Sequence, residues 1–468
     1  MPNAGAESVP ASAVPVVLQA LGADGTYRGH RNEAITDTAG QVVAELAMVP
    51  SFFVGRSIDT QRKVRPLPLP ERERIIDEAA GRFVETTVAG LTFDQYVGLA
   101  ARVAGIPIRI AAQCARAIPE QCRGAFASMA AARPAGAAMD WREDRTRCGS
   151  SVWVRRGKVY GVHASGNAVA LLGNWVEALL LGYRVAVRPS RREPFTTYRL
   201  VSALRDAGLR SEDAVYLPTD YAGADELLRS ADLSMVYGGQ DVVDKYASNP
   251  TVFANGPGRS KILITAEQDW REYLDVIVDS IAHLGGMGCI NTTAVLYEGD
   301  PRPLAEAIAE RLALIKPLPP THPDARLPTQ PIGRAHQLAG LLAGVAEGSI
   351  PLLGADQVVA EVDGGCAALR PAVHLLCEPN LKQINTELAF PCVWVSPWSR
   401  SDGLAPLRRS LVLNAVTTDQ QLIDELIDEP TITNLYHGHH PTYHLAPEIP
   451  HDGFLADFLM RNKGCIRD

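Results

Sequence analysis

Residues 283–293 are His283-Leu284-Gly285-Gly286-Met287-Gly288-Cys289-Ile290-Asn291-Thr292-Thr293, a turn that places one thiol closely after three glycines. The glycines allow positive φ angles and close approach of a ligand to the backbone. Backbone N–H groups in such a turn can lower the pKa of a thiol and hold an oxyanion. The pattern therefore favours a nucleophilic cysteine. It also fits a small buried residue beside a tight turn, because free cysteine is among the most buried residue types.

The overall composition is that of a globular protein. The chain has 468 residues, of which 46% are hydrophobic, a length that suits two or three domains. The formal net charge is −8 and the isoelectric point is about 5.8. Since no basic block stands out, we expect no nucleic-acid partner.

The cysteine pattern indicates a reduced compartment. No C-x-x-C or zinc-type spacing occurs, and the cysteine density is low for a disulfide scaffold. The N-terminal segment lacks a basic region and its short apolar run contains prolines, so we expect no signal peptide and a cytoplasmic location. The most apolar long window, residues 162–183, contains Asn167, Asn174 and Glu177, which argues against a membrane span. The eight cysteines are residues 114, 122, 148, 289, 366, 377, 392 and 465.

The first half of the chain changes character twice. Residues 1 to about 65 suggest short strands and turns, and residues 70–132 carry a helical pattern that predicts a layer of helices beneath a sheet. Residues 134–150 suggest an extended connector. After Val162 strands and helices alternate, which predicts a parallel, doubly wound sheet with right-handed crossovers. Ligands of such sheets bind outside the carboxyl ends of the strands. The predicted strands are 183–188, 214–217, 233–237 and 251–253, and the predicted helices are 167–181, 194–207, 222–229 and 238–247.

A second α/β cycle begins at Ser260. It predicts strands at 261–265, 293–296, 372–376 and 392–395, and helices at 270–284, 302–315 and 419–427. A polar, helix-like segment closes the chain at 453–461. We therefore expect an N-terminal helical layer with a dinucleotide-binding domain at 1–259. We expect a catalytic domain carrying Cys289 at 260–435, and a C-terminal, oligomerisation segment at 436–468.

At this point the order of features resembles the aldehyde dehydrogenase superfamily, and within it the CoA-acylating branch with acyl-CoA reductases of the bioluminescence fatty-acid-reductase type. The resemblance covers about residues 152–454. Each matching piece is weak alone, but the set has the family's order and approximate spacing. The pieces are Gly161-Val162-His163-Ala164-Ser165-Gly166-Asn167, Val187-Arg188-Pro189-Ser190-Arg191, Val236-Tyr237-Gly238-Gly239, Gly285-Gly286-Met287-Gly288-Cys289, Glu387-Leu388-Ala389-Phe390-Pro391 and Pro450-His451-Asp452-Gly453-Phe454.

This resemblance implies an aldehyde-dehydrogenase-like α/β fold: a doubly wound cofactor domain, an α/β catalytic domain and a small oligomerisation segment. It implies that Cys289 is the nucleophile and that the Asn167 amide belongs to the oxyanion hole; an alternative role for Asn167 is to cap a helix. Gly238 and Gly239 fall in the family's cofactor loop, where a helix N-terminus favours the pyrophosphate. Glu387 resembles the ribose-binding carboxylate, although Ala389 stands where the family often has phenylalanine.

The stretch Arg188-Pro189-Ser190-Arg191 departs from the family's Lys-Pro-Ser-Glu. A glutamate at the last position would repel a 2′-phosphate, whereas Arg191 would attract one through charge-assisted hydrogen bonds, with Arg192 adding to the patch. We therefore predict that Arg188, Ser190 and Arg191 bind NADP(H) in preference to NAD(H). The alternative is a solvated basic turn.

The second departure concerns the base that hydrolytic members use to activate water. Residues 254–261, Ala-Asn-Gly-Pro-Gly-Arg-Ser-Lys, contain no carboxylate and look like the Gly-Pro-Gly of CoA-acylating members. Without a base, hydrolysis of an acyl-cysteine is slow. This predicts NADPH-dependent reduction of an acyl thioester, either acyl-CoA or a phosphopantetheine thioester on a carrier protein, to an aldehyde. Two alternatives stay open: an NADP-dependent dehydrogenase giving a free acid with a base from elsewhere, and a noncatalytic scaffold.

Histidines supply the remaining candidates. His163 and His283 flank two of the motifs and could assist protonation, or serve structure alone. His437, His439, His440 and His444 invite a metal site, but Pro441 interrupts them and no acidic partner has a fixed spacing, so we expect no metal. The family resemblance implies a homodimer or homotetramer.

Overall fold

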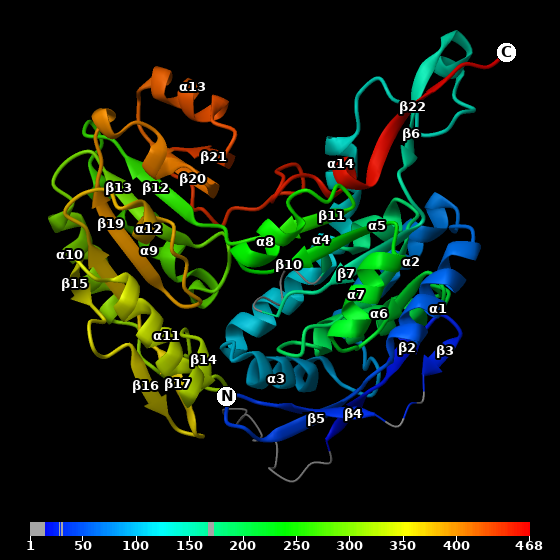
Figure 1. The fold of residues 1–468 in the computed structure, drawn as a ribbon, viewed down its shortest axis with the longest axis horizontal. Helices are drawn as coiled ribbons and strands as arrows, with labels where there is room; N and C mark the ends of the chain where they lie inside the picture. The colour runs from blue at the N-terminus through cyan, green and yellow to red at the C-terminus, as the bar shows by residue number, and fades with distance from the viewer. Residues whose placement is uncertain (1–14, 28, 30, 167–172) are drawn as a thin grey trace, which may run out of the picture.

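The computed structural model describes residues 15–27, 29, 31–166 and 173–468. Two seven-stranded sheets dominate the described chain and lie in separate lobes (Figure 1). A strap of chain passes from the lobe of the second sheet back to a projecting arm beside the first (Figure 1). The fold is the aldehyde-dehydrogenase-like α/β fold that the sequence predicts.

The first sheet is doubly wound around its central strand. Strands β7 to β11 run parallel, while β2 pairs antiparallel with β9. The chain leaves β7 toward β8 on one side and returns to β10 on the other, so the order of strands reverses next to β7. In sheet order the strands are β11 (Val252–Asn255), β10 (Leu233–Tyr237), β7 (Val159–His163), β8 (Arg184–Arg188), β9 (Ala214–Tyr216), β2 (Ala20–Gly22) and β3 (Gly25–Tyr27).

Helices cover both faces of this sheet, which explains why its strands are apolar throughout. Ala186 of β8 faces the core under α1 and α7, whereas Val185 and Val187 face the core under α2, α4, α5 and α6. The expectation of only strands and turns before residue 65 is wrong, because α1 is a helix whose Val54 and Ile58 complete that smaller core. The helices of this lobe are α1 (Ser51–Lys63), α2 (Leu69–Glu85), α3 (Phe93–Ala104), α4 (Ile108–Ala132), α5 (Val176–Leu180), α6 (Phe195–Asp206), α7 (Tyr221–Ser230) and α8 (Gln240–Tyr246).

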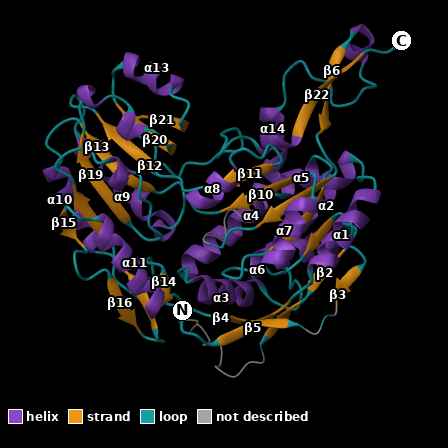
Figure 2. Ribbon diagram, viewed as in Figure 1, coloured by secondary structure: helices purple, strands orange, loops and turns teal. Residues whose placement is uncertain are grey.

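A three-stranded sheet lies at the edge of this lobe, near α3 (Figure 2). In it β5 (Val42–Ala47) pairs with β1 (Val16–Leu18) on one side and with β4 (Asn32–Thr36) on the other. Glu33 of β4 forms an ion pair with Arg191 of the predicted cofactor loop.

The second sheet begins with β12 and is also mainly parallel. Its strands are, in sheet order, β15 (Ile350–Leu353), β18 (Ala372–Leu375), β19 (Cys392–Pro397), β13 (Thr292–Tyr297), β12 (Ser260–Ile264), β20 (Ser410–Val416) and β21 (Ile432–His437), with β15 antiparallel to β18. The helices of this lobe are α9 (Leu274–Ala282), α10 (Arg302–Ala313), α11 (Ile332–Val345), α12 (Leu381–Ile384) and α13 (Gln420–Asp428). A small sheet of β14 (Thr329–Pro331), β17 (Cys366–Leu369) and β16 (Val359–Val362) lies beside α11.

The projecting arm is a two-stranded antiparallel sheet. It consists of β6 (Ser150–Arg155) and β22 (Met460–Cys465), so the last strand pairs with residues more than 300 positions earlier (Figure 2). The predicted terminal helix is therefore only partly correct, because α14 (Leu455–Leu459) is short and the chain then becomes a strand. Within the described residues, every helix is too short or too polar to cross a membrane.

The two large sheets meet end to end. Residues 256–259 join the carboxyl end of β11 directly to the amino end of β12. The functional motifs therefore lie at the carboxyl ends of β7, β8 and β10, or just before the amino ends of β12, β13 and β19. Binding outside the carboxyl ends, at the reversal of strand order, is the usual arrangement in doubly wound sheets.

Candidate active site

The turn that carries Cys289 has a backbone that requires glycine. Leu284, Gly285 and Gly286 have φ angles of 49°, 77° and 68°, three consecutive residues in the left-handed region. A Cβ at Gly286 would also collide with the backbone at Pro391, just before β19. The two glycines thus let the chain reverse after α9 and bring Cys289 to the amino end of β13.

Asn291 fastens this turn from the inside. Its Oδ1 accepts a hydrogen bond of 2.8 Å from the Gly288 backbone N–H. Its Nδ2 donates to the carbonyl oxygens of Ser280 and His283, at 3.0 and 2.9 Å. Because Asn291 is only 3% exposed, these bonds satisfy a buried amide and fix the backbone on both sides of the thiol.

The segment 254–261 lies directly against the cysteine. A Cβ at Gly258 would overlap the Cys289 carbonyl group, so only glycine fits there. The next strand confirms the contact, because Ser260 Oγ donates 3.0 Å to the same carbonyl oxygen. Residues 254–261 therefore present backbone atoms, and no carboxylate of their own, to this cysteine.

A histidine from the far end of the chain reaches the thiol. The Cys289 Sγ lies 3.3 Å from His451 Nε2, across 162 residues of sequence. His451 Nδ1 lies 2.6 Å from Asp452 Oδ2. The three side chains form a chain of contacts from thiol to imidazole to carboxylate, and the His451 and Asp452 side chains are 21% and 23% exposed.

His451 is held in place through its backbone. Asn434 of β21, which is 7% exposed, donates from Nδ2 to the His451 carbonyl oxygen at 2.8 Å and to the Leu411 carbonyl oxygen at 3.0 Å. Burial by itself lowers the pKa of His451, but electrostatic interaction and hydrogen bonds with the adjacent Cys289 and Asp452 raise that pKa well above its ordinary value. The geometry thus favours an imidazolium beside the thiol sulfur.

His451 and Asp452 are residues of the site that were not predicted from the sequence. Both lie in a matching motif, Pro450-His451-Asp452-Gly453-Phe454, but no spacing rule connects them to Cys289. The available signal was a histidine followed directly by an acidic residue in a segment without regular structure.

Glu387 is joined to the Cys289 region by a hydrogen bond to Arg259. Its Oε2 accepts 2.9 Å from the Arg259 backbone N–H, next to Gly258. The Arg259 guanidinium donates to Gln240 Oε1 of α8 at 2.7 Å and to the Asn385 carbonyl oxygen at 3.0 Å. Burial raises the pKa of Glu387, although the neighbouring backbone N–H groups and Arg259 oppose the rise. The predicted ribose-binding carboxylate thus binds Arg259, the residue that follows Gly258, which itself contacts Cys289.

Gly238 and Gly239 form the loop between β10 and α8. The Gly238 N–H donates 3.1 Å to the Asn255 carbonyl oxygen, and Gly239 caps α8 with its carbonyl oxygen toward Val242 at 3.0 Å. Tyr237 precedes them, and burial together with the charges of Asp452 and Cys289 raises the pKa of its phenol. This loop therefore lies near the cysteine at the junction of the sheets.

The predicted adenosine-binding residues form a separate group at the carboxyl end of β8. Ser190 Oγ accepts 3.2 Å from the Arg192 backbone N–H, which shapes the loop. Arg191 is paired with Glu33 of β4 at 2.8 Å. Arg188 is half-buried, and its Nε finds no hydrogen-bond partner among the described residues. A buried, unpartnered N–H at this position fits a ligand that supplies the missing acceptor.

The other sequence candidates fall as follows. Asn167 lies outside the described residues, so its role stays a prediction. His163 Nε2 lies 3.2 Å from the Ala224 carbonyl oxygen, and His283 stacks on Tyr443 with ring centroids 3.7 Å apart. Burial lowers the pKa of both histidines to about 4, so both are neutral near pH 7. The contacts found for these two histidines lie away from the thiol.

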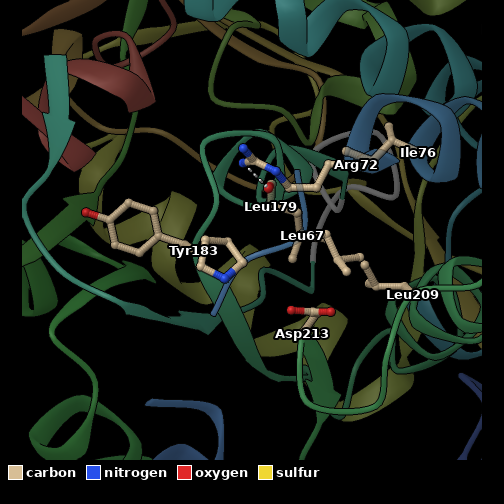
Figure 3. A pocket seen from close by; sticks show the side chains of 8 residues that line it. Leu67, Arg72, Ile76, Leu179, Tyr183, Leu209 and Asp213 are labelled. Carbon is tan, nitrogen blue, oxygen red and sulfur yellow. Dashed lines mark hydrogen bonds between the residues drawn. The ribbon is translucent and has the colours of Figure 1, made fainter. Parts of the chain in front are cut away.

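The remaining features do not add to the site. No group of three or more metal-binding side chains occurs in the described part of the chain. A small cavity lies between α2, the end of α5 and the amino ends of β8 and β9, where Arg72 donates 3.2 Å to the Leu179 carbonyl oxygen (Figure 3). That is the end of the first sheet opposite to Arg188 and Tyr237, so this cavity does not belong to the active site.

The arrangement suits acyl transfer. A thiol in contact with an imidazole is activated as a nucleophile, and backbone N–H groups at the start of β13 can face a developing oxyanion. Two glycine-bearing loops and one carboxylate surround it, a composition that suits a phosphate- and ribose-containing cofactor.

Comparisons with known proteins agree with this geometry. The sequence profile of the aldehyde dehydrogenase family matches residues 56–405. The fold is similar to indole-3-acetaldehyde dehydrogenase AldA of P. syringae, solved as a mutant with NAD⁺ and IAA, with 14% identity, 97% of each chain covered and a TM-score of 0.80. Aldehyde dehydrogenase KauB of Pseudomonas aeruginosa gives 14% identity, 96% coverage of each chain and a TM-score of 0.80.

An aldehyde dehydrogenase from Bacillus cereus, solved with NAD⁺, gives 14% identity, 96% coverage of each chain and a TM-score of 0.78. No protein of curated function matches the sequence. Because the family profile covers about three quarters of the chain, the chain belongs to the aldehyde dehydrogenase family, whose members are oxidoreductases acting on aldehydes.

Proposed function

We propose that the protein reduces an acyl thioester, acyl-CoA or an acyl-carrier protein, to an aldehyde with NADPH. One observation carries the proposal: the segment 254–261, which contains no carboxylate, lies against Cys289 with Gly258 in contact with the cysteine backbone. Thioester exchange at a cysteine needs no activated water.

The chain's own residues account for the first half of the reaction. The Cys289 thiolate attacks the thioester carbonyl, and the thiol of the substrate leaves, which gives an acyl-Cys289 intermediate. The Cys289 backbone N–H and the Asn167 amide are the predicted donors to the oxyanion. Gly286, Gly258 and Asn291 hold the cysteine rigidly, which preserves the alignment of sulfur and carbonyl carbon.

The residues at the junction fit a nicotinamide cofactor. When bound, it supplies the hydride that reduces the acyl carbonyl. Gly238 and Gly239 would lie along its pyrophosphate, Glu387 would hold a ribose, and Arg188, Ser190 and Arg191 would hold the adenosine end. The fit is supported by the buried Nε of Arg188, which has no hydrogen-bond partner among the described residues, and by the contacts of Arg259 with Gln240 and Glu387.

The test follows NADPH absorbance with acyl-CoAs from acetyl to long-chain and aromatic, beside parallel reactions with NADH. We expect aldehyde and free CoA in equal amounts from at least one acyl-CoA, and no product from Cys289→Ala, which must still fold. Absence of turnover with every acyl-CoA, together with CoA-independent reduction of NADP⁺ by aldehydes, would contradict the proposal. Homodimer or homotetramer formation stays a prediction for a sizing experiment.

A second candidate is favoured by one specific contact. His451 lies 3.3 Å from the Cys289 sulfur and, in neutral form, could activate water against an acyl-Cys289. The protein would then oxidise aldehydes to free acids. Measuring whether the product from an aldehyde and NADP⁺ is a free acid or, in the presence of CoA, an acyl-CoA separates the two functions.

A further inference from the structure

The contact between His451 and the thiol sulfur bears on where the proton goes in the proposed reaction. Reduction of an acyl thioester consumes one hydride and one proton and releases an aldehyde and a free thiol. The hydride goes to the carbonyl carbon, and the expelled thiolate must take the proton. An alkyl thiolate such as that of CoA leaves more slowly than an aryl thiolate, because alkyl thiols have the higher pKa values, about 8.5, so a proton donor at the leaving sulfur speeds the step.

We propose that His451, oriented by Asp452, is the catalytic acid that protonates the leaving thiol, and that the same imidazole receives the Cys289 proton beforehand. The inference rests on the proposed thioester substrate. The new element is the acid–base group, which the segment 254–261 does not supply.

Geometry supports each part of this assignment. Nε2 of His451 faces the sulfur at 3.3 Å, and an incoming thioester places its own sulfur next to that atom when its carbonyl carbon approaches Sγ. Nδ1 is engaged with Asp452 at 2.6 Å, which holds the ring so that Nε2 carries the transferable proton toward the site. Neither His163 nor His283 has this position, since their contacts are with Ala224 and Tyr443.

The backbone of His451 is held by contacts that do not involve its ring. Asn434 binds the His451 carbonyl oxygen at 2.8 Å, and the Thr442 hydroxyl donates 2.7 Å to the carbonyl oxygen of Ile290, next to the cysteine. The strap from β21 to α14 is thus fixed to β21 and to the Cys289 turn by hydrogen bonds from side chains to backbone carbonyl oxygens. A substitution of the His451 side chain leaves those contacts in place.

The proton balance then closes. In the proposed sequence His451 first takes the proton of Cys289, which gives a thiolate and an imidazolium. Attack forms the carbon–sulfur bond to Sγ, the bond to the substrate's sulfur breaks, and that sulfur takes the proton from Nε2, leaving a free thiol, acyl-Cys289 and neutral His451. Hydride addition to the carbonyl and collapse of the thiohemiacetal release aldehyde and Cys289 thiolate, and His451 regains one proton from solvent.

The acylation step can be measured without NADPH. Stoichiometric enzyme is mixed with an acyl-CoA, released CoA is followed with a thiol reagent after rapid quenching, and acyl-Cys289 is measured by intact mass. The same acyl group is then supplied as an aryl thioester of thionitrobenzoate, whose thiolate is stable without protonation and leaves unaided. The variants are His451→Gln and Asp452→Asn, with His440→Gln as a control for an exposed histidine of the same strap.

We expect His451→Gln to slow acylation by acyl-CoA by about 10²-fold or more, the usual contribution of a positioned acid or base. Loss of thiol activation slows acylation by both substrates. The rate loss with the aryl thioester should nevertheless be smaller than that with acyl-CoA by about tenfold or more, because the aryl thiolate leaves without a proton. Acylation by the aryl thioester also shows that the variant is folded. Asp452→Asn has the same pattern with a smaller loss, and His440→Gln matches the wild type.

Equal losses with both thioesters would overturn the proposal, since His451 would then only activate or position Cys289, and so would an unchanged rate with acyl-CoA. These results are independent of aldehyde formation. A His451-dependent acylation without any reduction by NADPH would keep the proposal and contradict the proposed reductase. NADPH-dependent aldehyde formation with unaltered acylation in His451→Gln would support the proposed reductase and contradict the role of His451.

Discussion

Arg191, in the loop after β8, is bound to Glu33 of β4, with 2.8 Å between the Arg191 guanidinium and the Glu33 carboxylate. Both side chains are partly exposed, at 43% and 33%, so this pair contributes only modestly to stability. Its importance lies in its position, because Arg191 is the residue predicted to attract a 2′-phosphate. A carboxylate in contact with that arginine would repel the same phosphate.

Cofactor preference therefore depends on both members of the pair. We expect Glu33→Gln to tighten NADPH binding about threefold to tenfold and to leave NADH binding unchanged, because it frees Arg191 and removes a negative charge. Arg191→Ala should weaken NADPH alone. Dissociation constants from nicotinamide fluorescence titrations check both, with Glu45→Gln as the control, since Glu45 contacts Asn32 in the same small sheet. Equal shifts for the two cofactors would contradict this role.

Gly258 should be indispensable for activity. In Gly258→Ala the new Cβ overlaps the O, C and Cα atoms of Cys289, and all three are backbone atoms that cannot rotate away. We expect a loss of about 1–3 kcal/mol in the free energy of unfolding and an activity reduced by about 10²-fold or more. Urea denaturation and steady-state rates measure these effects. Gly98→Ala on α3 is the control, since a Cβ there contacts nothing within 4 Å; similar losses in both variants would contradict the prediction.

Asn291 should act on the thiol through the backbone. Asn291→Ala removes the acceptor for Gly288 and leaves the Ser280 and His283 carbonyl oxygens without their donor. Buried unsatisfied groups of this kind cost about 1–3 kcal/mol each, so we expect lower stability and slower alkylation of Cys289 by iodoacetamide. Asn462→Ala on the exposed strand β22 serves as the control. An unchanged alkylation rate would show that the turn holds its shape without Asn291.

Lys261 of β12 should make stability depend on pH. It is fully buried without a carboxylate partner among the described residues, and Nζ donates to the Arg408 carbonyl oxygen and Ser410 Oγ, both at 2.9 Å. Burial, with a smaller effect of Arg259, lowers its pKa to about 7. Its unfolded value is about 10.4, so between these values the unfolded chain binds the extra proton and stability rises with pH.

Comparison of wild type with Lys261→Met isolates this effect. We expect wild type to gain about 2 kcal/mol more than the variant in the free energy of unfolding between pH 7 and pH 9, as measured by urea denaturation. The variant is less stable at both pH values because it leaves acceptors unpaired, so only the difference in slope is diagnostic. Lys463→Met, exposed on β22, should follow the wild-type slope. Parallel curves for wild type and Lys261→Met would contradict the prediction.

The sequence by itself determined the alternation of strands and helices. Apolar runs such as residues 184–188 and 260–264 can be buried on both faces only in a parallel, helix-covered sheet, which fixes the fold class. Glycines 285 and 286 indicated the turn that presents Cys289, since its positive φ angles exclude most other residues. The helix α1 and the strand β22 were not predicted, because the local pattern does not show which segment packs on a distant core or pairs with a distant strand.

Only the tertiary structure decided what surrounds the thiol. His451 lies 162 residues from Cys289, and the contact exists because the strap after β21 returns across the amino ends of the second sheet. Likewise Glu33 meets Arg191 because β4 lies beside the end of β8. Periodicity and turn chemistry are set by neighbours in sequence, whereas proton transfer and charge pairing depend on distances of about 3 Å between residues that only the folded chain brings together.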